Sequence, residues 1–259
     1  MTRRRRLSLG ALVLGAWLLM VGSAAGATEA PRVAVLTATG TVDQVLAGYL
    51  EEGIAAAARN GAHAVVIELN TPGGSLDATN RIVSTLLESP LPTIVWVSPA
   101  GGFAASAGTF ITLASNVALM APGTRIGAAS PVGGGGEDIE GTLGDKVRND
   151  AIAAIRSIAE TRGRNVEWAV ATVADARSSP ASEAVELGAV DGIAATFDEV
   201  LTAATGRTVT VGGGAQVTLA LTGATRDELP MNPLQGFLHL LSDPNIAFIL
   251  FTVGFYGLV

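Results

Sequence analysis

Short apolar runs alternate with amphipathic stretches between residues 32 and 205 of the chain. Consecutive apolar residues predict buried strands, whereas apolar residues that recur every three or four positions predict helices. Because the two patterns alternate, we expect an α/β fold with a largely parallel sheet. The strands expected are 32–36, 64–69, 93–97, 117–120 and 190–194. The helices expected are 42–59, 76–88, 104–113, 146–161, 166–174, 182–187 and 197–205, with a loop over 122–144.

A different pattern occupies the C-terminal part of the chain. Residues 208–211 and 216–221 are expected to pair as a hairpin across the glycines between them. We expect residues 209–244 to form a connector that includes an amphipathic helix over 234–241. Residues 245–259 carry no charge. This uncharged run predicts the start of a transmembrane helix, with a buried terminal helix as the alternative.

The first 27 residues have the layout of a secretory signal. Four arginines, Arg3 to Arg6, precede an apolar run from Leu7 to Val21, and small residues follow as far as Ala27. This order predicts a signal peptide over 1–27 with cleavage after Ala27. An uncleaved N-terminal anchor is the alternative.

Composition and charge narrow the functional classes. Hydrophobic residues make up 49% of the chain and charged residues 15%, which is typical of a folded domain rather than a disordered one. Without the four signal arginines, 12 basic residues remain against 23 acidic ones, a formal charge of −11 (12 − 23). Such an acidic domain is not expected to bind nucleic acid. The absence of cysteine excludes thiol catalysis, disulfides and thiolate metal sites.

A glycine turn at 71–75, which reads TPGGS, joins an expected strand to an expected helix. Two glycines at the start of a helix let backbone N–H groups point into a cleft, where the helix dipole favours negative charge. Oxyanion holes are built in this way. A phosphate site is less well supported, because no lysine follows at the spacing of a phosphate-binding loop. An ordinary tight turn is the other alternative.

The segment 104–108, which reads AASAG, places one hydroxyl among side chains too small to crowd a substrate. A serine nucleophile needs this openness. Ser106 is therefore a candidate nucleophile, and the amides of Ala107 and Gly74 are candidate donors to the oxyanion that forms. The alternative is that these small residues serve only close helix packing.

A serine nucleophile needs a base within hydrogen-bond reach. His63 precedes a buried strand and His239 lies beside the uncharged C-terminal run, so we expect both histidines to be structural. The chain contains fifteen arginines and a single lysine, Lys146. Arginine does not deprotonate in proteins, whereas a desolvated lysine can act as a base with a pKa of roughly 7 to 8. Lys146 is therefore the candidate base, with a solvated lysine at a helix start as the alternative.

Taken together, these residues resemble the NfeD membrane proteases of the ClpP-like, crotonase-fold class. The resemblance covers about residues 33–197. Its motifs are NTPGG at 70–74, ASAGT at 105–109, APGT at 121–124, IGA at 126–128, Lys146, and RGRN at 162–165. The resemblance implies a ClpP/crotonase-like fold of repeated β-β-α units, with Ser106 as nucleophile and Lys146 as its base. It also implies that Gly74, and with less support Gly73, join Ala107 in the oxyanion hole.

The resemblance further implies a serine endopeptidase domain over 28–208. The expected signal and the expected membrane segment together predict that this domain lies on the extracytoplasmic side of the cell membrane. Relatives cleave apolar segments of membrane proteins, are paired with stomatin-like membrane proteins, and continue into several membrane helices and a small β-barrel. We expect no cofactor, and a homodimer or higher oligomer. A non-catalytic scaffold that binds a stomatin-like protein is the main alternative. An acyl-CoA enzyme of the same fold would need an acidic catalytic residue and an adenine site, and neither is evident.

Overall fold

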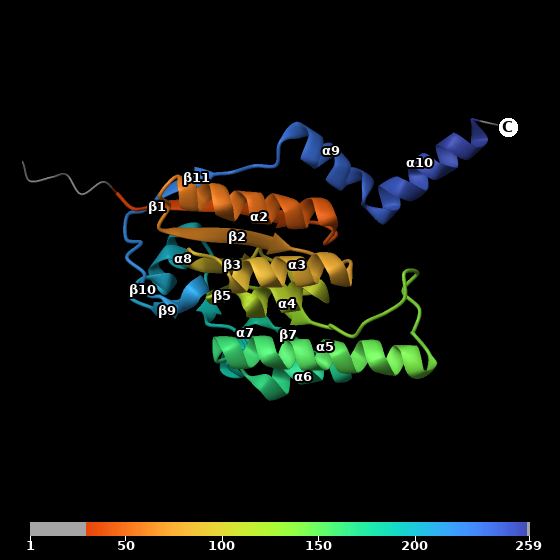
Figure 1. The fold of residues 1–259 in the computed structure, drawn as a ribbon, viewed down its shortest axis with the longest axis horizontal. Coiled ribbons are helices and arrows are strands. Elements are labelled where there is room, and N and C mark those ends of the chain that lie inside the picture. Colours follow the sequence, from red (N-terminus) through yellow and green to blue (C-terminus); the bar gives the residue numbers. More distant parts are fainter. Residues whose placement is uncertain (1–29, 258–259) are drawn as a thin grey trace, which may run out of the picture. The chain divides into compact units, whose positions relative to one another are not determined.

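The computed structural model describes residues 30–257, so the expected signal at 1–27 lies outside the described residues. A six-stranded parallel sheet forms the centre of the domain (Figure 1). In spatial order its strands are β11 (Thr225–Glu228), β1 (Arg32–Thr39), β2 (Ala64–Asn70), β3 (Thr93–Val97), β5 (Val117–Met120) and β8 (Gly192–Ile193). This sheet confirms the α/β fold expected from the sequence.

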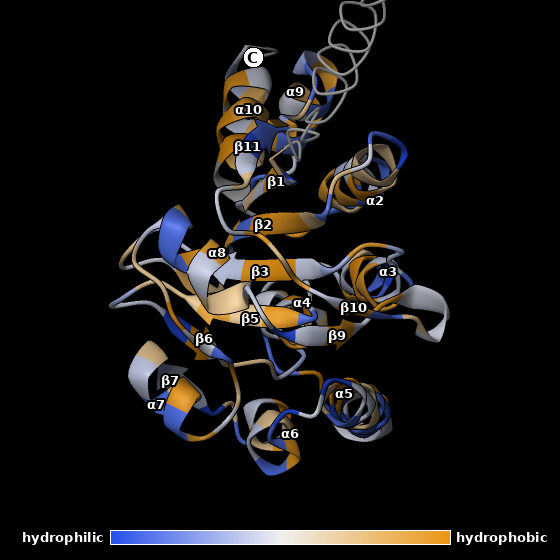
Figure 2. Cartoon of the chain, turned by 90° about the vertical axis from the view of Figure 1, so that its left-hand side faces the viewer, coloured by the Kyte–Doolittle hydropathy of each residue, from blue (hydrophilic) through white to orange (hydrophobic). Residues whose placement is uncertain are grey.

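Helices cover both faces of the sheet (Figure 2). The helices of the domain up to residue 204 are α2 (Gln44–Arg59), α3 (Leu76–Leu87), α4 (Ala107–Ala114), α5 (Gly141–Arg162), α6 (Val166–Ala174), α7 (Ala181–Glu186) and α8 (Phe197–Ala204). Along β1, Ala34 and Leu36 belong to the core shared with α2 and α3, whereas Val33 and Val35 belong to the core shared with α8. Successive side chains of a strand point to opposite faces, so both faces of this parallel sheet are buried.

Polar side chains determine where the helices after β1 and β2 begin. Asp43 accepts the N–H of Leu46 at 2.7 Å at the start of α2. Ser75 accepts the N–H of Ala78 at 3.2 Å at the start of α3. A cap of this kind stabilises a helix by about 1 kcal/mol. Both caps follow the carboxyl ends of their strands, so these helix N-termini gather at the edge of the sheet where α/β proteins bind ligands.

A second, three-stranded sheet was not predicted from the sequence. It consists of β4 (Phe103–Ala105), β6 (Arg125–Gly127) and β7 (Ser178–Pro180) in the order β4-β6-β7. The helix expected from residue 104 therefore begins at Ala107, after β4. The expected loop over 122–144 contains β6, and α5 begins at Gly141 rather than Lys146. Glycines at 141 and 144 have low helix propensity, which hides this first turn in the sequence pattern.

The expected hairpin is present as β9 (Thr208–Thr210) and β10 (Gln216–Thr218), an antiparallel pair across the 3₁₀ turn η1 (Gly212–Gly214). The polar strand β11 was not predicted. It lies within the expected connector and pairs in parallel with β1, so that Thr225 lies opposite Arg32. The first strand of the domain is thus covered by one of its last segments.

Two helices complete the described chain, α9 (Pro233–Leu241) and α10 (Pro244–Tyr256). The position of α9 confirms the amphipathic helix expected over 234–241. Within residues 30–257 no single helix is both long and apolar enough to cross a bilayer. The pair 233–241 and 246–256, bent by 75°, meets the requirement jointly by length and composition. The membrane segment expected over 245–259 stays a prediction.

Candidate active site

Ser106 lies at the junction between β4 and α4, with φ 52° and ψ −114°. Few residues other than glycine adopt a positive φ, because the side chain then crowds the backbone. Such a conformation costs about 1–3 kcal/mol and is concentrated at functional sites. Ser106 is half-buried at the N-cap position of α4, yet its side chain makes no capping hydrogen bond. The hydroxyl is therefore not engaged in holding the helix.

The strand β6 holds this strained turn in place. The N–H of Ser106 donates to the carbonyl oxygen of Gly127 at 3.0 Å. The fully buried hydroxyl of Thr109 accepts the N–H of Gly127 at 3.1 Å and lies 3.1 Å from the carbonyl oxygen of Ala104. Hydrogen bonds thus fix the chain on both sides of the serine. This role of Thr109 was not predicted from the sequence, although the residue belongs to the ASAGT motif.

The glycine turn at 71–75 contacts Ser106 directly. Gly73 has φ 119°, and its carbonyl oxygen accepts the N–H of Val42 at 2.8 Å. A methyl group on Gly73 would lie 2.7 Å from Cβ and 3.1 Å from Oγ of Ser106. Only glycine permits this approach and this backbone conformation together. The two motifs that the sequence analysis paired are therefore adjacent in the structure.

Some of the backbone N–H groups around Ser106 already donate a hydrogen bond, whereas others do not. The N–H of Gly73 donates to the hydroxyl oxygen of Thr71 at 3.0 Å. Among the described residues, no acceptor receives the N–H of Gly74 or that of Ala107, the first residue of α4. The first N–H groups of a helix have no intrahelical partner and lie at its positive end. Of the three expected oxyanion donors, Gly74 and Ala107 thus have an unengaged N–H group.

A cavity of about 60 Å³ opens beside Ser106, between the glycine turn, Phe110 of α4 and Val132 in the loop before α5. A second cavity, of about 360 Å³, shares Leu76, Thr79 and Phe110 with the first and extends to α5. Apolar side chains form most of the shared wall. The two neighbouring cavities provide an apolar space next to the serine hydroxyl.

Lys146 lies near the start of α5 and lines the larger cavity together with Asp77 and Asp150. It is exposed, and no described residue forms a hydrogen bond or ion pair with its amine. The structure thus brings Lys146 to the cavity next to Ser106 but not into hydrogen-bond contact with the serine. The nitrogen of a base must come within about 3 Å of the oxygen whose proton it removes, and such contacts are often loose before substrate binds.

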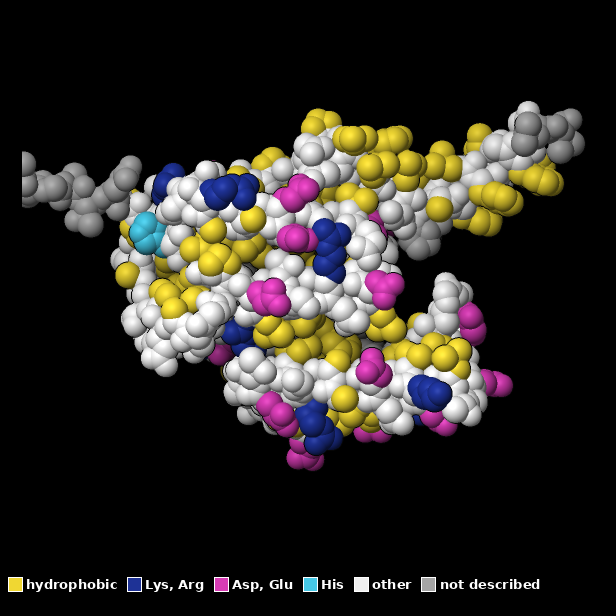
Figure 3. All heavy atoms as spheres, viewed as in Figure 1, with side chains coloured by type: hydrophobic (Ala, Val, Ile, Leu, Met, Phe, Trp, Pro, Cys, Tyr) yellow, Lys and Arg dark blue, Asp and Glu magenta, His cyan; other side chains and the backbone are white. Residues whose placement is uncertain are grey.

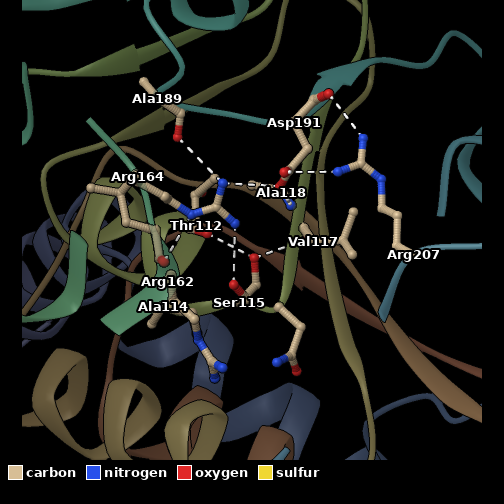
Figure 4. A network of polar contacts seen from close by, with 12 residues as sticks. Thr112, Ala114, Ser115, Val117, Ala118, Arg162, Arg164, Ala189, Asp191 and Arg207 are labelled. Carbon is tan, nitrogen blue, oxygen red and sulfur yellow. Dashed lines mark hydrogen bonds and ion pairs between the residues drawn. The ribbon is translucent and has the colours of Figure 1, made fainter. Parts of the chain in front are cut away.

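Two arginines hold the C-terminal end of α4 (Figure 4). Nε of Arg162 donates to the carbonyl of the last residue of α4 at 2.7 Å. Arg164 donates to the carbonyls of Leu113 and Ser115, each at 3.1 Å. Carbonyls at a helix C-terminus lack intrahelical partners, and cations there complement the helix dipole. The helix is therefore fixed at the end opposite Ser106.

Asp191 connects Arg164 to Ala118 of β5 and to Arg207, which follows α8 (Figure 4). Its carboxylate bonds Nη1 of Arg164 at 2.9 Å, Nη1 of Arg207 at 3.0 Å and the N–H of Ala118 at 2.7 Å. Burial, with a smaller effect of the neighbouring Arg164 charge, lowers the pKa of Arg162 below its usual value. The RGRN motif at 162–165 carries no sign of this role in the sequence, because nothing in its spacing indicates a partner in α4.

The two histidines are engaged away from Ser106. Nδ1 of His63 accepts the N–H of Arg32 at 3.2 Å, where β1 begins. Nδ1 of His239 lies 2.8 Å from a carboxylate oxygen of Asp43, and its Nε2 lies 3.0 Å from the carbonyl oxygen of Thr39. Neither imidazole forms a hydrogen bond with Ser106, and neither histidine lines the serine cavity or the larger cavity that Lys146 lines.

Replacing Gly73 by alanine is expected to displace Ser106, because the added methyl would lie 2.7 Å from the serine Cβ. The positive φ adds to the cost, for a total loss of stability of about 1–3 kcal/mol. Urea unfolding of Gly73→Ala measures this loss. The matched control is Gly134→Ala, since a methyl there meets no atom within 4 Å. Equal stability of the two variants would show that the close approach of Gly73 to Ser106 does not matter.

Residues 32–211, which include all of these motifs, match the sequence profile of the family described as NfeD1b, N-terminal domain. The chain belongs to the NfeD1b family. This assignment confirms the NfeD resemblance inferred from the motifs at 70–74, 105–109 and 162–165. The matched segment begins at β1 and ends just after β9.

Two curated relatives support the NfeD1b assignment. The membrane-bound protease PH1510 of Pyrococcus horikoshii is 37% identical over 210 residues, which is 80% of this chain and 47% of that protein. The membrane protein NfeD1b of Bacillus subtilis is 29% identical over 184 residues, 70% of this chain and 39% of that protein. The chain therefore spans less than half the length of these relatives.

Solved structures show the same NfeD1b domain fold. The membrane-bound stomatin-specific protease 1510-N, as a lysine-to-alanine mutant in complex with a substrate peptide, has a TM-score of 0.76 and 32% identity, over 82% of this chain and 97% of that one. A serine-to-alanine mutant has a TM-score of 0.72 and 33% identity, over 79% and 99%. ClpP1 of Listeria monocytogenes, at 0.53 and 24%, over 64% and 94%, shares the fold. The ClpP-like fold is confirmed, whereas these comparisons do not support the crotonase part of the expectation.

Proposed function

We propose that this chain carries a membrane-associated serine endopeptidase in which Ser106 is the nucleophile. The observation that carries the proposal is the contact between Ser106 and the glycine turn. This contact places an unengaged hydroxyl beside the N–H groups of Gly74 and Ala107, which have no acceptor among the described residues. The strained backbone of Ser106 and the protease relatives add support.

In the proposed reaction, neutral Lys146 accepts the proton of Ser106 as Oγ bonds to the peptide carbonyl carbon. The N–H groups of Gly74 and Ala107 donate to the oxyanion of the tetrahedral intermediate. The C–N bond then breaks, and the lysine returns the proton to the leaving amine. Water, deprotonated by the same lysine, attacks the acyl-enzyme. The ester C–O bond to Oγ then breaks, Oγ takes the proton back from the lysine, and the acid product is released.

The substrate class follows from the walls of the two cavities. Leu76, Phe110 and Val132 are apolar and favour an apolar peptide segment. PH1510-N is a stomatin-specific protease, so a stomatin-like membrane protein is the proposed partner. A peptide that fills both cavities would cover Lys146 and bring the two reacting groups into one water-poor space. The same proposal places the domain on the extracytoplasmic side of the cell membrane and includes self-association.

The role of Lys146 is tested by Lys146→Arg and Lys146→Ala. Arginine keeps the positive charge but does not release its proton near neutral pH, so it cannot act as a base. Both variants are expected to hydrolyse an apolar fluorogenic peptide about 10² to 10⁴ times more slowly than the parent. The matched control is Arg148→Ala, which removes an exposed cation from the same helix and should keep full activity.

Activity retained in Lys146→Arg would exclude proton transfer by this lysine. The alternative is a non-catalytic scaffold. It is supported by the lack of a hydrogen bond between Lys146 and Ser106. It predicts that the parent is inert on apolar peptides and is not labelled by a serine-directed phosphonate. Labelling of the parent at Ser106 would exclude the scaffold.

A further inference from the structure

The helix α9 is bound to the domain through its polar side chains. Nε2 of Gln235 donates to a carboxylate oxygen of Glu52 at 3.0 Å, and Nδ1 of His239 lies 2.8 Å from Asp43. Gln235 and His239 are four residues apart, so they share one face of α9. Glu52 and Asp43 belong to α2 and its cap. An ordinary surface helix packs its apolar face inward, whereas here the inward face is polar.

The opposite face of α9 is apolar and exposed. Leu234, Phe237 and Leu238, at the i, i+3 and i+4 positions, are 65%, 57% and 43% exposed. Figure 3 shows hydrophobic side chains gathered over this part of the molecule, continuing along α10. We name these three residues the outer face of α9. No described residue covers it.

The connector before α9 is tied down, so the orientation of the helix is fixed. The hydroxyl of Tyr49 donates to the carbonyl of Leu229 at 2.6 Å, and the N–H of Leu229 donates to the carbonyl of Val35 at 2.9 Å. Burial raises the pKa of the Tyr49 phenol above its usual value, which keeps the donor protonated. Asn232 and Gln235 then form a capping box that starts the helix. The outer face is therefore presented by a rigid support.

The following helix indicates what covers the outer face. α10 has no charged residue, and its side chains Phe248, Phe251 and Phe255 are each more than half exposed. It leaves α9 at a bend of 75°. A helix that lies flat on a bilayer and continues into a crossing helix has such a near-perpendicular bend. If α9 itself entered the hydrocarbon, the acidic partners Glu52 and Asp43 would have to enter with it or lose their bonds, which is costly.

We propose that α9 lies flat in the membrane interface, with its outer face in the boundary between headgroups and acyl chains, and that the lipid surface is its occupant. Interfacial helices of this kind bury their apolar face roughly 5–10 Å deep. α9 carries no lysine or arginine, and its charged neighbours Asp43 and Glu52 are acidic. Its attachment depends on apolar area and not on anionic lipid.

This arrangement places the candidate active site close to the bilayer surface. Asp43, the partner of His239, directly follows Val42, whose N–H donates to the carbonyl of Gly73. Two adjacent residues, Val42 and Asp43, therefore connect the glycine turn to α9. A substrate segment would meet the site where it leaves the membrane.

The test uses the full chain, which contains no cysteine, with one cysteine introduced at a time and labelled with an environment-sensitive fluorophore. The positions are Phe237→Cys on the outer face, Phe251→Cys on α10 and Thr202→Cys on the exposed surface of α8. Each protein is reconstituted into phosphatidylcholine vesicles that carry bromine at shallow or deep acyl positions. Because α10 alone could attach the protein to vesicles, the measurement has to report locally on α9.

We expect the Phe237 probe to shift to shorter wavelength and to be quenched more by shallow than by deep bromines. The Thr202 probe should not be quenched, and neither salt nor added phosphatidylglycerol should change the Phe237 result. Quenching at Phe237 no greater than at Thr202 would overturn the inference. A lipid-independent spectral shift at Phe237 that grows with protein concentration would overturn it in favour of a second copy of the chain.

Discussion

Replacement of Ser106 by alanine should reduce peptide hydrolysis by at least about a thousandfold, since the variant lacks the only proposed nucleophile. The oxyanion donors Gly74 and Ala107 stay in place, so substrate affinity is expected to change little. Initial rates on an apolar fluorogenic peptide, with kcat and KM determined separately, measure the effect. Ser157→Ala, which removes an exposed hydroxyl from α5, is the matched control and should keep full activity.

A second substitution at the same position separates chemistry from folding. Ser106→Gly also lacks the hydroxyl, but glycine accepts the positive φ without the crowding that a Cβ causes. We expect Ser106→Gly to be as inactive as Ser106→Ala and more stable by about 1 kcal/mol. Urea unfolding gives the comparison. Substantial hydrolysis by either variant would show that another group attacks the peptide.

Replacement of Asp191 by alanine is expected to destabilise the fold by about 3–5 kcal/mol, the cost of removing one partner from a buried ion pair. The side chain of Arg164 is only 4% exposed and that of Asp191 is 24% exposed, so water has little access to the guanidinium that loses its carboxylate. The N–H of Ala118 loses its acceptor as well. Thermal and urea unfolding measure the loss.

The matched control for Asp191→Ala is Glu160→Ala, which removes an exposed carboxylate from α5. It should change the free energy of unfolding by no more than about 0.5 kcal/mol. Since Arg164 also bonds the carbonyls at the end of α4, Asp191→Ala should lower peptide hydrolysis even under conditions where the protein stays folded. Wild-type stability in Asp191→Ala would mean that the backbone carbonyls around Arg164, together with solvent, suffice to stabilise its buried charge.

The elements with the strongest local pattern were predicted accurately. β3 at 93–97, β5 at 117–120 and α6 at 166–174 agree residue for residue with the expected ranges. The missed strands have little local signal. β11 reads TRDE and is exposed throughout, and β4 has only three residues. They form strands because they pair with strands from distant parts of the chain, and a local sequence pattern does not reveal such partners.

The candidate site divides in the same way. The pairing of the glycine turn with Ser106 was predictable, because each segment comes after an expected strand of one parallel sheet, 64–69 for the turn and 93–97 for the serine. The strand β4, which directly precedes Ser106 and belongs to the second sheet, was not part of that prediction. The positive φ of Ser106 and the cap that Arg164 places on α4 were not predictable, since they depend on contacts between distant segments. Lys146 was expected to be a desolvated base. In the structure it is exposed at the neighbouring cavity, and its catalytic role is still a proposal.

The pairing of β11 with β1 has a consequence for the order in which the domain assembles. β1 is the first strand to be synthesised, yet its outer edge has no partner until residues 225–228 have been made. Unpaired strand edges can pair with other chains, and contacts between distant segments form slowly. α9 follows β11 closely in the chain. We therefore expect β11 to cover the edge of β1 late in folding. The helix α9 should reach its final position at nearly the same time.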